Sequence, residues 1–209
     1  MNLLMNLYTE HQILEHVLST FKIFLSGLIC SYILSLILIV LGLRWSNVRK
    51  LIYFMVGLLQ PIPRIVLFPL LLILMGINDM ARTSLVLVGL LFSNYLILDS
   101  QFNHLKWNPL KKILKVYKVP RLKILYYYYL RGALPALGSS YKNSVGYGLT
   151  LAIVAESSFS NKGLGFLICK FWERYDMPEL YLTIGLVSVL ALLLNLIPRG
   201  IKWMMARSV

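Results

Sequence analysis

Among the polar residues inside the apolar stretches of this 209-residue sequence, seven are candidates for contact with a solute or a neighbouring helix. They are Gln60, Arg64, Ser140, Lys142, Ser144, Tyr147 and Thr150. Hydroxyl, amide and cationic groups can hydrogen-bond a polar molecule or stabilise a negative charge. Charged groups within an apolar segment are candidates for function, because they are costly wherever lipid surrounds them. Hydrogen bonding between helices explains the small polar residues equally well, and the long Arg64 side chain could also reach the membrane interface.

No motif for covalent catalysis, ATP hydrolysis or metal binding accompanies these residues. The sequence contains no Walker A pattern, no H-E-x-x-H and no nucleophile elbow. Cys30 and Cys169 have no closely spaced ligand, so two unpaired thiols are favoured over a metal or redox site. We therefore predict that this chain has no catalytic residue, no metal and no cofactor of its own.

The composition indicates a protein that lies in a lipid bilayer. Hydrophobic residues make up 58% of the chain and charged residues 14%, and the mean hydropathy is +0.73. Soluble domains carry about a quarter charged residues. A net charge of +13 would suggest nucleic acid as the partner of a soluble protein. Here the Lys and Arg residues fall between apolar runs, where they fix membrane topology, so binding to nucleic acid is disfavoured.

Five apolar segments are predicted to cross the hydrocarbon core as parts of one transmembrane domain, residues 1–209. The predicted spans are 21–43, 51–77, 83–98, 132–154 and 180–197. Residues 1–20 are amphipathic but interrupted by Glu10 and Glu15, which predicts an interfacial helix before the first span. The expected fold class is an all-α, polytopic membrane protein.

Prolines and small residues indicate which spans are irregular or buried. The second span contains Pro61 and Pro63, which remove backbone donors and predict a break near 60–64. Irregular backbone is tolerated in a membrane only where protein or a cavity covers it. The fourth span is rich in serine and glycine, which let helices approach closely, so other helices are expected around it. Pro198 and Arg199 are expected to end the last span.

The distribution of basic residues predicts the orientation. Of the 21 Lys and Arg residues, fourteen lie in the 44–50 loop, the 99–131 insert and the C-terminal tail, where Asp99 is the single acid. The opposite side, which includes the N-terminus and a predicted loop at 156–179, has five basic and seven acidic residues. Cytoplasmic loops carry the excess of Lys and Arg, so the N-terminus is predicted outside and the C-terminus inside.

Three groups of short motifs follow one another along the chain. They are Pro61, Pro63, Pro69, Leu70 and Gly76 in the second span, Leu134, Pro135, Val154, Ala155 and Glu156 around the fourth, and Gly163, Leu164 and Gly165 in the loop that follows. Their order and spacing resemble those of permease subunits of binding-protein-dependent ABC importers, of the nitrate/sulfonate/taurine-like family. The resemblance covers nearly the whole chain, and each motif alone is weak. Many members of that family have one more N-terminal span than the five predicted here.

The resemblance implies a type I ABC importer permease fold in the bacterial cytoplasmic (inner) membrane, with a solute path that the chain lines and gates. The implied partners are a second permease subunit, a cytoplasmic ATPase dimer that binds ATP and Mg, and an extracytoplasmic solute-binding protein. Pro63 and the seven polar residues named first would line the path or gate. Glu156, Gly163 and Gly165 would contact the binding protein, although Glu156 could equally touch or cap a neighbouring loop. The solute would be a small organic anion or resemble a vitamin precursor.

The basic insert at 99–131 is expected to hold the cytoplasmic coupling helices that dock on the ATPases. The family's signature there is Glu-Ala-Ala, three residues and then Gly, whereas this chain has Lys112, Ile113 and Leu114 at the first places and Lys118 at the last. Position and surroundings still match, so the ATPase groove would be more acidic than usual, or a more typical permease would be the second subunit. The residues expected to couple are Asn108, Lys111, Lys112, Lys115, Tyr117, Lys118, Pro120 and Arg121.

Two other functions fit parts of the sequence. The transmembrane component of a vitamin-type energy-coupling importer would also dock ATPases through cytoplasmic helices, but the motif order around Glu156 favours the binding-protein-dependent family. A permease-derived membrane scaffold or regulator without transport would explain the altered coupling signature. That alternative predicts that no stable complex with an ATPase forms.

Overall fold

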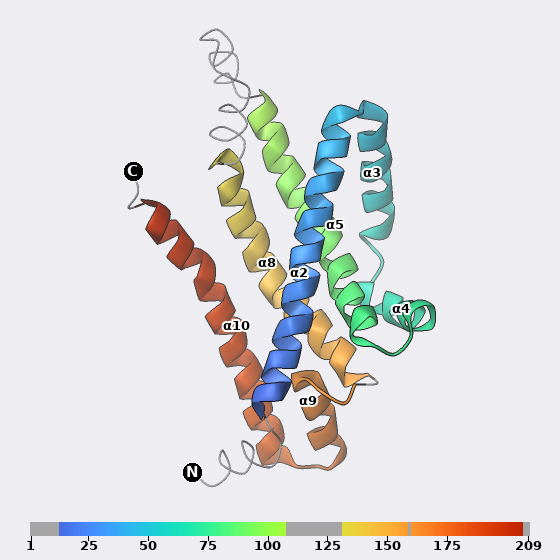
Figure 1. The fold of residues 1–209 in the computed structure, drawn as a ribbon, viewed down its shortest axis with the longest axis vertical. Coiled ribbons are helices and arrows are strands. Elements are labelled where there is room, and N and C mark those ends of the chain that lie inside the picture. The colour runs from blue at the N-terminus through green and yellow to red at the C-terminus, as the bar shows by residue number, and fades with distance from the viewer. Residues whose placement is uncertain (1–12, 108–130, 159, 207–209) are drawn as a thin grey trace.

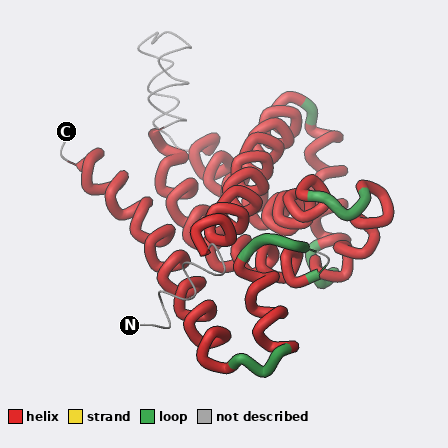
Figure 2. The backbone as a smooth tube through the Cα atoms, turned by 60° about the horizontal axis from the view of Figure 1, so that its bottom comes forward, coloured by secondary structure: helices red, strands yellow, loops and turns green. Residues whose placement is uncertain are grey.

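The regular structure of this chain is helical throughout residues 13–107, 131–158 and 160–206, which are the residues that the computed structural model describes. The helices are α2 (Ile13–Arg44), α3 (Ser46–Leu59), the 3-10 helix η1 (Arg64–Leu67), α4 (Phe68–Met75), α5 (Asp79–Trp107), α8 (Arg131–Ser157), α9 (Leu164–Glu173) and α10 (Met177–Ala206) (Figure 1). Short loops join consecutive helices within the described stretches (Figure 2). The prediction of an all-α fold is confirmed for this part of the chain.

The core of the molecule lies where α2, α5 and α8 pack together. Buried residues from all three helices meet there: Ile23, Phe24, Leu28, Leu85, Val86, Leu90, Val145, Leu149 and Ala152. Two glycines allow the close approach. A Cβ atom on Gly27 would lie 2.7 Å from Val86, and one on Gly148 would lie 2.9 Å from the Phe24 ring. The serine- and glycine-rich helix is therefore surrounded by others, as small residues at helix interfaces predict.

Three helices are long and apolar enough to cross a membrane, over Ile13–Gly42, Asp79–Gln101 and Met177–Ile197. The pair Ser46–Leu59 and Arg64–Met75 would add a fourth if it forms one span, although its two halves meet at 98°. Helix α8 is long enough but, because of its small and polar residues, it is not apolar enough to belong to this group of described helices. The count of five spans stays a prediction.

The first helix corrects the predicted boundary at residue 20. We expected a separate interfacial helix before the first span, but α2 runs without a break from Ile13 to Arg44. Its 32 residues extend about 48 Å, which is longer than a hydrocarbon core about 30 Å thick. The first turns of α2 can therefore stand outside the core while belonging to the same helix. Residues 1–12 lie outside the described chain.

The predicted break in the second apolar segment is confirmed. Helix α3 ends at Leu59 and η1 begins at Arg64, so the four residues between them contain Pro61 and Pro63. Neither proline has an N–H to continue the helix. The segment also starts earlier than the predicted residue 51, because α3 begins at Ser46.

The last helix continues past the predicted end of the last span at Pro198, although its apolar stretch ends at Ile197. Helix α10 continues through that position to Ala206. A proline at 198 cannot donate to the carbonyl of Leu194, which would be left without a helical partner. The hydroxyl of Tyr141, on α8, donates to that carbonyl at 3.2 Å. A side chain from a neighbouring helix thus satisfies the oxygen that the proline leaves free.

Several helix ends gather at the two opposite ends of the molecule. The junction of α2 with α3, the end of α5, the start of α8 and the end of α10 lie at one end of the molecule (Figure 1). The start of α2, the end of α8 and all of α9 lie at the other. The predicted loop at 156–179 contains α9, so it is not irregular throughout. Of the predicted insert at 99–131, residues 99–107 continue α5, and 108–130 lie outside the described chain.

Candidate functional site

One face of α8 is polar and exposed over its central turns. The exposed residues are Ser139, Lys142, Asn143, Gly146, Tyr147 and Thr150. Their spacing alternates between three and one, so they form a single stripe along the helix. The opposite face of α8 is buried against α2 and α5. A stripe with a lysine, an asparagine and two hydroxyl groups is unsuited to hydrocarbon, so it faces a water-filled space or another protein.

A cavity of about 310 Å³ lies between this stripe and the broken second segment. Its lining comes from both elements: Pro63, Arg64, Ile65, Gly146, Tyr147, Thr150 and Leu151. The guanidinium of Arg64 stands 4.8 Å from the centroid of the Tyr147 ring, which is a cation–π contact. The same guanidinium donates from Nη2 to the Ser93 hydroxyl at 3.0 Å. The proline break therefore places the guanidinium of Arg64 beside the middle of the α8 stripe.

The predicted path residues fall into three groups. Pro63, Arg64, Tyr147 and Thr150 line the cavity together, and Lys142 lies on the same exposed face of α8. Gln60 is exposed in the break but does not line the cavity. Ser140 and Ser144 are fully buried on the other face of α8. Their role in the path stays a prediction, and in this structure they serve helix packing.

A buried hydrogen-bond network joins α2, α5 and α8 through Asn94. The Asn94 amide oxygen accepts from Ser140 at 2.6 Å and from Ser144 at 2.8 Å, and its amide nitrogen donates to Ser31 at 2.9 Å. Tyr32 adds a hydrogen bond to Ser140 at 3.3 Å. Sequence reasoning did not single out Asn94, although an amide in the middle of an apolar run was the available signal. A satisfied polar network of this kind fixes the register of the three helices.

A second junction holds the first turns of α2 against the loop that leads to α9. The carboxylate of Glu156, at the end of α8, accepts from the Thr20 hydroxyl at 2.7 Å and from the Gly165 N–H at 3.1 Å, both through Oε2. Thr20 in turn accepts from the Leu164 N–H at 2.8 Å. His16 accepts from the Gly163 N–H at 3.0 Å. We call these five residues and Gly165 the outer junction, after the side on which the predicted orientation would place them. It holds Thr20 and His16 of α2 against the start of α9.

Two glycines of the outer junction cannot be replaced without a clash. Gly163 has φ +113°, which favours glycine, and a Cβ atom there would lie 2.0 Å from the Glu156 carboxyl carbon. A Cβ atom on Gly165 would lie 2.0 Å from the carbonyl oxygen of Ile153. Both positions must be glycine because the loop lies directly on the end of α8.

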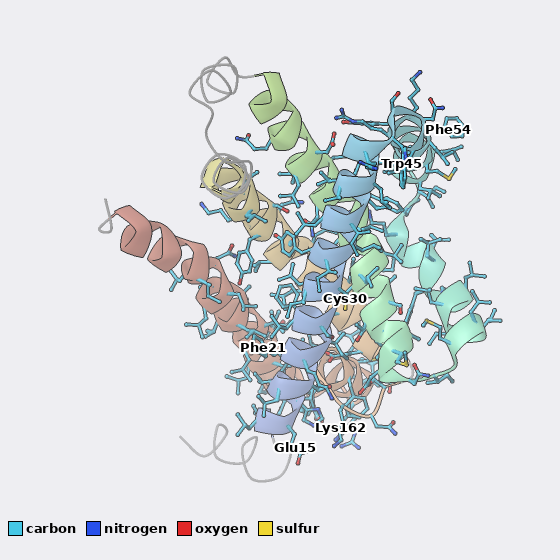
Figure 3. The ribbon with its side chains drawn as sticks, turned by 45° about the horizontal axis from the view of Figure 1, so that its top comes forward. Glu15, Phe21, Cys30, Trp45, Phe54 and Lys162 are labelled. Carbon is cyan, nitrogen blue, oxygen red and sulfur yellow. The ribbon has the colours of Figure 1, made fainter. Side chains whose placement is uncertain are left out.

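The predicted contact of Glu156, Gly163 and Gly165 with a binding protein has no exposed side chain to carry it in this structure, because all three residues are buried. It stays a prediction. The surface beside them carries an exposed ion pair between Lys162 and Glu15, at 3.3 Å, which joins the loop to α2 (Figure 3). A partner at this end would meet that pair before it met Glu156.

A third junction ties α3 to α5 at the opposite end of the molecule. Asp99 is almost fully buried, with a side-chain exposure of 2%, and pairs with Arg49 at 2.9 Å. The Tyr53 hydroxyl also donates to this carboxylate. The guanidinium of Arg49 lies 5.6 Å from the centroid of the Tyr53 ring. These residues were not predicted as functional; the signal was that Asp99 is the single acid on a strongly basic side. The pair stands at the base of the predicted coupling insert.

Asp99 is more deeply buried than Arg49, so removal of one or the other should lower the stability of the protein by different amounts. Arg49→Met takes the cation from a buried carboxylate, whereas Asp99→Asn leaves a guanidinium that is 23% exposed and can be hydrated. We expect Arg49→Met to destabilise the protein by about 1–3 kcal/mol, and Asp99→Asn to destabilise it less. Thermal unfolding midpoints in a mild detergent measure the difference.

Lys50→Met is the matched control, because Lys50 is the next residue, is exposed and has no ion pair among the described residues. It should leave the midpoint unchanged. A midpoint for Arg49→Met equal to that of Lys50→Met would show that the ion pair does not hold α3 to α5.

The residues expected to couple to an ATPase, from Asn108 to Arg121, lie outside the described chain. Their prediction therefore has no structural counterpart here. What the structure provides is the position of the two helices that flank them. Helix α5 reaches Trp107 and α8 begins at Arg131, and these two helix ends lie at the same end of the molecule (Figure 1).

Comparison with known proteins adds evidence that is independent of these contacts. The model of the family described as "Binding-protein-dependent transport system inner membrane component" matches residues 39–208. The chain is 25% identical over 147 residues to the putative aliphatic sulfonates transport permease protein SsuC of Escherichia coli, covering 70% of this chain and 55% of that protein. It is 23% identical over 174 residues to the taurine transport system permease protein TauC of the same organism, covering 78% of this chain and 59% of that one. The chain thus spans a little over half the length of these relatives.

Proposed function

The chain belongs to the family of binding-protein-dependent transport system inner membrane components, and we propose that it lines the solute path of an ATP-driven importer. The observation that carries this proposal is the polar, exposed stripe of α8 beside the cavity at Arg64. The chain's own part is to bind, guide and gate a solute, while ATP hydrolysis belongs to partner chains.

The energetics of the stripe favour a path over a lipid-facing surface. A lysine at the centre of a membrane helix costs about 2.5–3.5 kcal/mol on insertion scales, and Asn143 and Thr150 add polar groups on the same face. Charged residues within membrane helices face the interior of a bundle or a water-filled cavity. A second permease subunit placed against this face would enclose the cavity and complete the path.

The proposed partners would meet opposite ends of the molecule. A cytoplasmic dimer of ATPases, which binds ATP and Mg, would dock on coupling helices within 108–121. An extracytoplasmic solute-binding protein would meet the end that carries α9 and the outer junction. This arrangement requires the N-terminus outside and the C-terminus inside. Closure of the ATPases would then move the helices as rigid bodies between two states, opening the path on one side at a time.

The proposed solute is a small organic anion. The two relatives named above are described as permeases for aliphatic sulfonates and for taurine, both of which carry a sulfonate group. The stripe and the cavity carry Lys142 and Arg64, and none of the described residues that line the cavity is acidic. Positive charge without a matching carboxylate suits an anionic cargo.

Purification of the tagged chain in mild detergent tests the proposal. We expect an ATPase to be recovered with the wild type and lost when Lys111, Lys112, Lys115 and Lys118 are all changed to Glu, because the charge of the docking surface is reversed. Mass spectrometry of the co-purified proteins measures this, and a solute-binding protein among them would identify the cargo.

The control reverses charge at the opposite end, with Lys162→Glu and Lys170→Glu. These changes should leave the ATPase attached, since both residues lie in or beside α9. If no ATPase accompanies the wild-type chain under the mildest detergent, the importer proposal fails, and a membrane scaffold without transport becomes the better explanation.

A further inference from the structure

We infer that Arg64 and Tyr147, together with the open space beside Gly146, form a binding site for the oxyanion group of the solute within the path. The group would be a carboxylate, sulfonate or phosphate. This inference rests on the proposed function and deepens it, because it names the residues that hold the solute and the chemistry that they recognise.

The charge balance of the described residues leads to this site. Arg49 and Arg82 pair with Asp99 and Asp79, and Lys162 pairs with Glu15. Arg64 has no carboxylate partner among the described residues, although it stands half-buried beside a cavity. Its contacts are neutral: the Ser93 hydroxyl and the Tyr147 ring. A guanidinium in an apolar setting is stabilised by an anion, and the cavity is the place where one can enter.

The guanidinium is held in a fixed plane that leaves donors for a ligand. Its Nη2 donates to Ser93 at 3.0 Å and the group lies over the Tyr147 ring at 4.8 Å. Arginine carries five N–H donors in a planar fork that matches two oxygens of a carboxylate, sulfonate or phosphate. One donor serves Ser93, so further donors are available. Because the fork is already oriented, binding costs little side-chain entropy.

The cavity is open where a solute would lie. A Cβ atom on Gly146 would meet no atom of another described element within 4 Å, although Gly146 lies between buried positions of the same helix. The volume of about 310 Å³ is at the lower end of the range for small-molecule sites, which suits a solute of a few heavy atoms. Lys142 lies one helical turn from Gly146 on the same face, about 6 Å along the axis, and can attract or receive the anion as it moves.

Protection of arginine from chemical modification tests this site without any need for transport. The full-length chain in detergent is treated with phenylglyoxal, and the modified arginines are located by mass spectrometry. We expect methanesulfonate, acetate or phosphate to slow the modification of Arg64 severalfold, and the uncharged methanesulfonamide to have no effect. Arg44, an exposed arginine at the end of α2, is the internal control and should react equally in every sample.

The three anions also distinguish the chemistry that the site prefers. Protection by methanesulfonate or acetate at lower concentration than phosphate would identify an organic acid as the ligand, and the reverse order would identify a phosphate group. Equal modification of Arg64 with and without all three anions would overturn the inference. Slowing of Arg44 and Arg64 alike would also overturn it, because the effect would then be a general one of the salt.

Transport by the assembled importer in proteoliposomes provides the second test, with taurine as the probe. Arg64→Gln is expected to lower the maximal uptake rate roughly ten- to hundredfold, since it removes a charge-assisted contact. Arg64→Lys should recover part of the rate because it restores the charge without the fork. Lys50→Gln, at an exposed residue of α3 that does not line the cavity, is the control and should transport as the wild type does. An unchanged rate in Arg64→Gln would overturn the inference.

The two proposals fail in different ways. If the importer proposal is wrong, no ATPase will be found in the purified complex. The result of the phenylglyoxal experiment does not depend on that outcome. Loss of the anion site would appear as unprotected Arg64 in a chain that still binds its ATPase.

Discussion

Gly165→Ala is expected to prevent the outer junction from forming and to destabilise the protein by about 3–5 kcal/mol. The added Cβ atom would lie 2.0 Å from the carbonyl oxygen of Ile153 and 2.9 Å from the Cβ atom of Glu156. The first contact is with helix backbone, which cannot rotate away as a side chain could. The loop would have to lift from α8, and the hydrogen bond from the Gly165 N–H to Glu156 would be lost with it. The amount of folded protein in the membrane and the thermal midpoint measure the effect.

Gly185→Ala is the matched control for that substitution. Gly185 lies in α10, and a Cβ atom there would meet nothing within 4 Å. Alanine is the better helix former by about 0.5–1 kcal/mol, so the control should be neutral or slightly stabilising. Equal midpoints for the two variants would show that the loop does not lie on α8 as the structure has it.

Replacement of Glu156 should destabilise the protein less than replacement of Gly165. Glu156 lies two residues beyond the predicted span, and burial raises the pKa of its carboxyl to about 7, against the opposing effect of the hydrogen bonds from Thr20 and Gly165. The group is therefore partly neutral at neutral pH. Glu156→Gln keeps an oxygen that both donors can reach, so it should cost less than Gly165→Ala.

Gly146→Trp is expected to stop transport while leaving the protein folded and bound to its ATPase. The side chain would project from the exposed stripe of α8 into the cavity, and none of the other described elements has an atom within 4 Å of the added Cβ. It would fill the space through which the solute passes, without disturbing the packing of α2 and α5. We expect uptake to fall at least tenfold, by steric exclusion, in proteoliposomes that contain the complete importer.

Two alanine substitutions make this experiment specific. Gly146→Ala adds one methyl group to open space and should keep both fold and transport. Gly148→Ala, two residues further along α8, would place its Cβ atom 2.9 Å from Phe24 and 3.1 Å from Leu90, so it should destabilise the protein. Normal uptake by a folded Gly146→Trp variant would show that this face of α8 is not the path, and the proposed function would lose its structural support.

The sequence by itself determined the class of the protein and the places where its helices are interrupted. Long apolar runs with few charges require helices in a bilayer, since each backbone group must find its partner within the segment. Pro61 and Pro63 fixed the break because a proline lacks the N–H that a helix needs, whatever surrounds it. The order of motifs also indicated the family, and the family match over residues 39–208 confirms it. These features depend on local chemistry, which is present in the linear chain.

Only the tertiary structure decided features that depend on contacts between distant segments. Pro198 does not end α10 because Tyr141, on another helix, donates to the carbonyl that the proline leaves free. The N–H groups of Gly163 and Leu164, at the start of α9, donate to the side chains of His16 and Thr20 on α2. In each case a side chain far away in sequence satisfies a group that local rules leave unsatisfied.

The candidate site also combines features that the sequence determines with features that only the tertiary structure decides. The sequence shows that polar residues lie along 139–150. It does not show which of them are buried and which face the cavity, because a helix of serines and glycines could pack on its neighbours through either face. Packing of α8 against α2 and α5 turned Ser140 and Ser144 inward to Asn94 and left Tyr147 and Thr150 facing the cavity. Which residues meet a solute depends on which face the core buries, and that is settled by the fit of whole helices against one another.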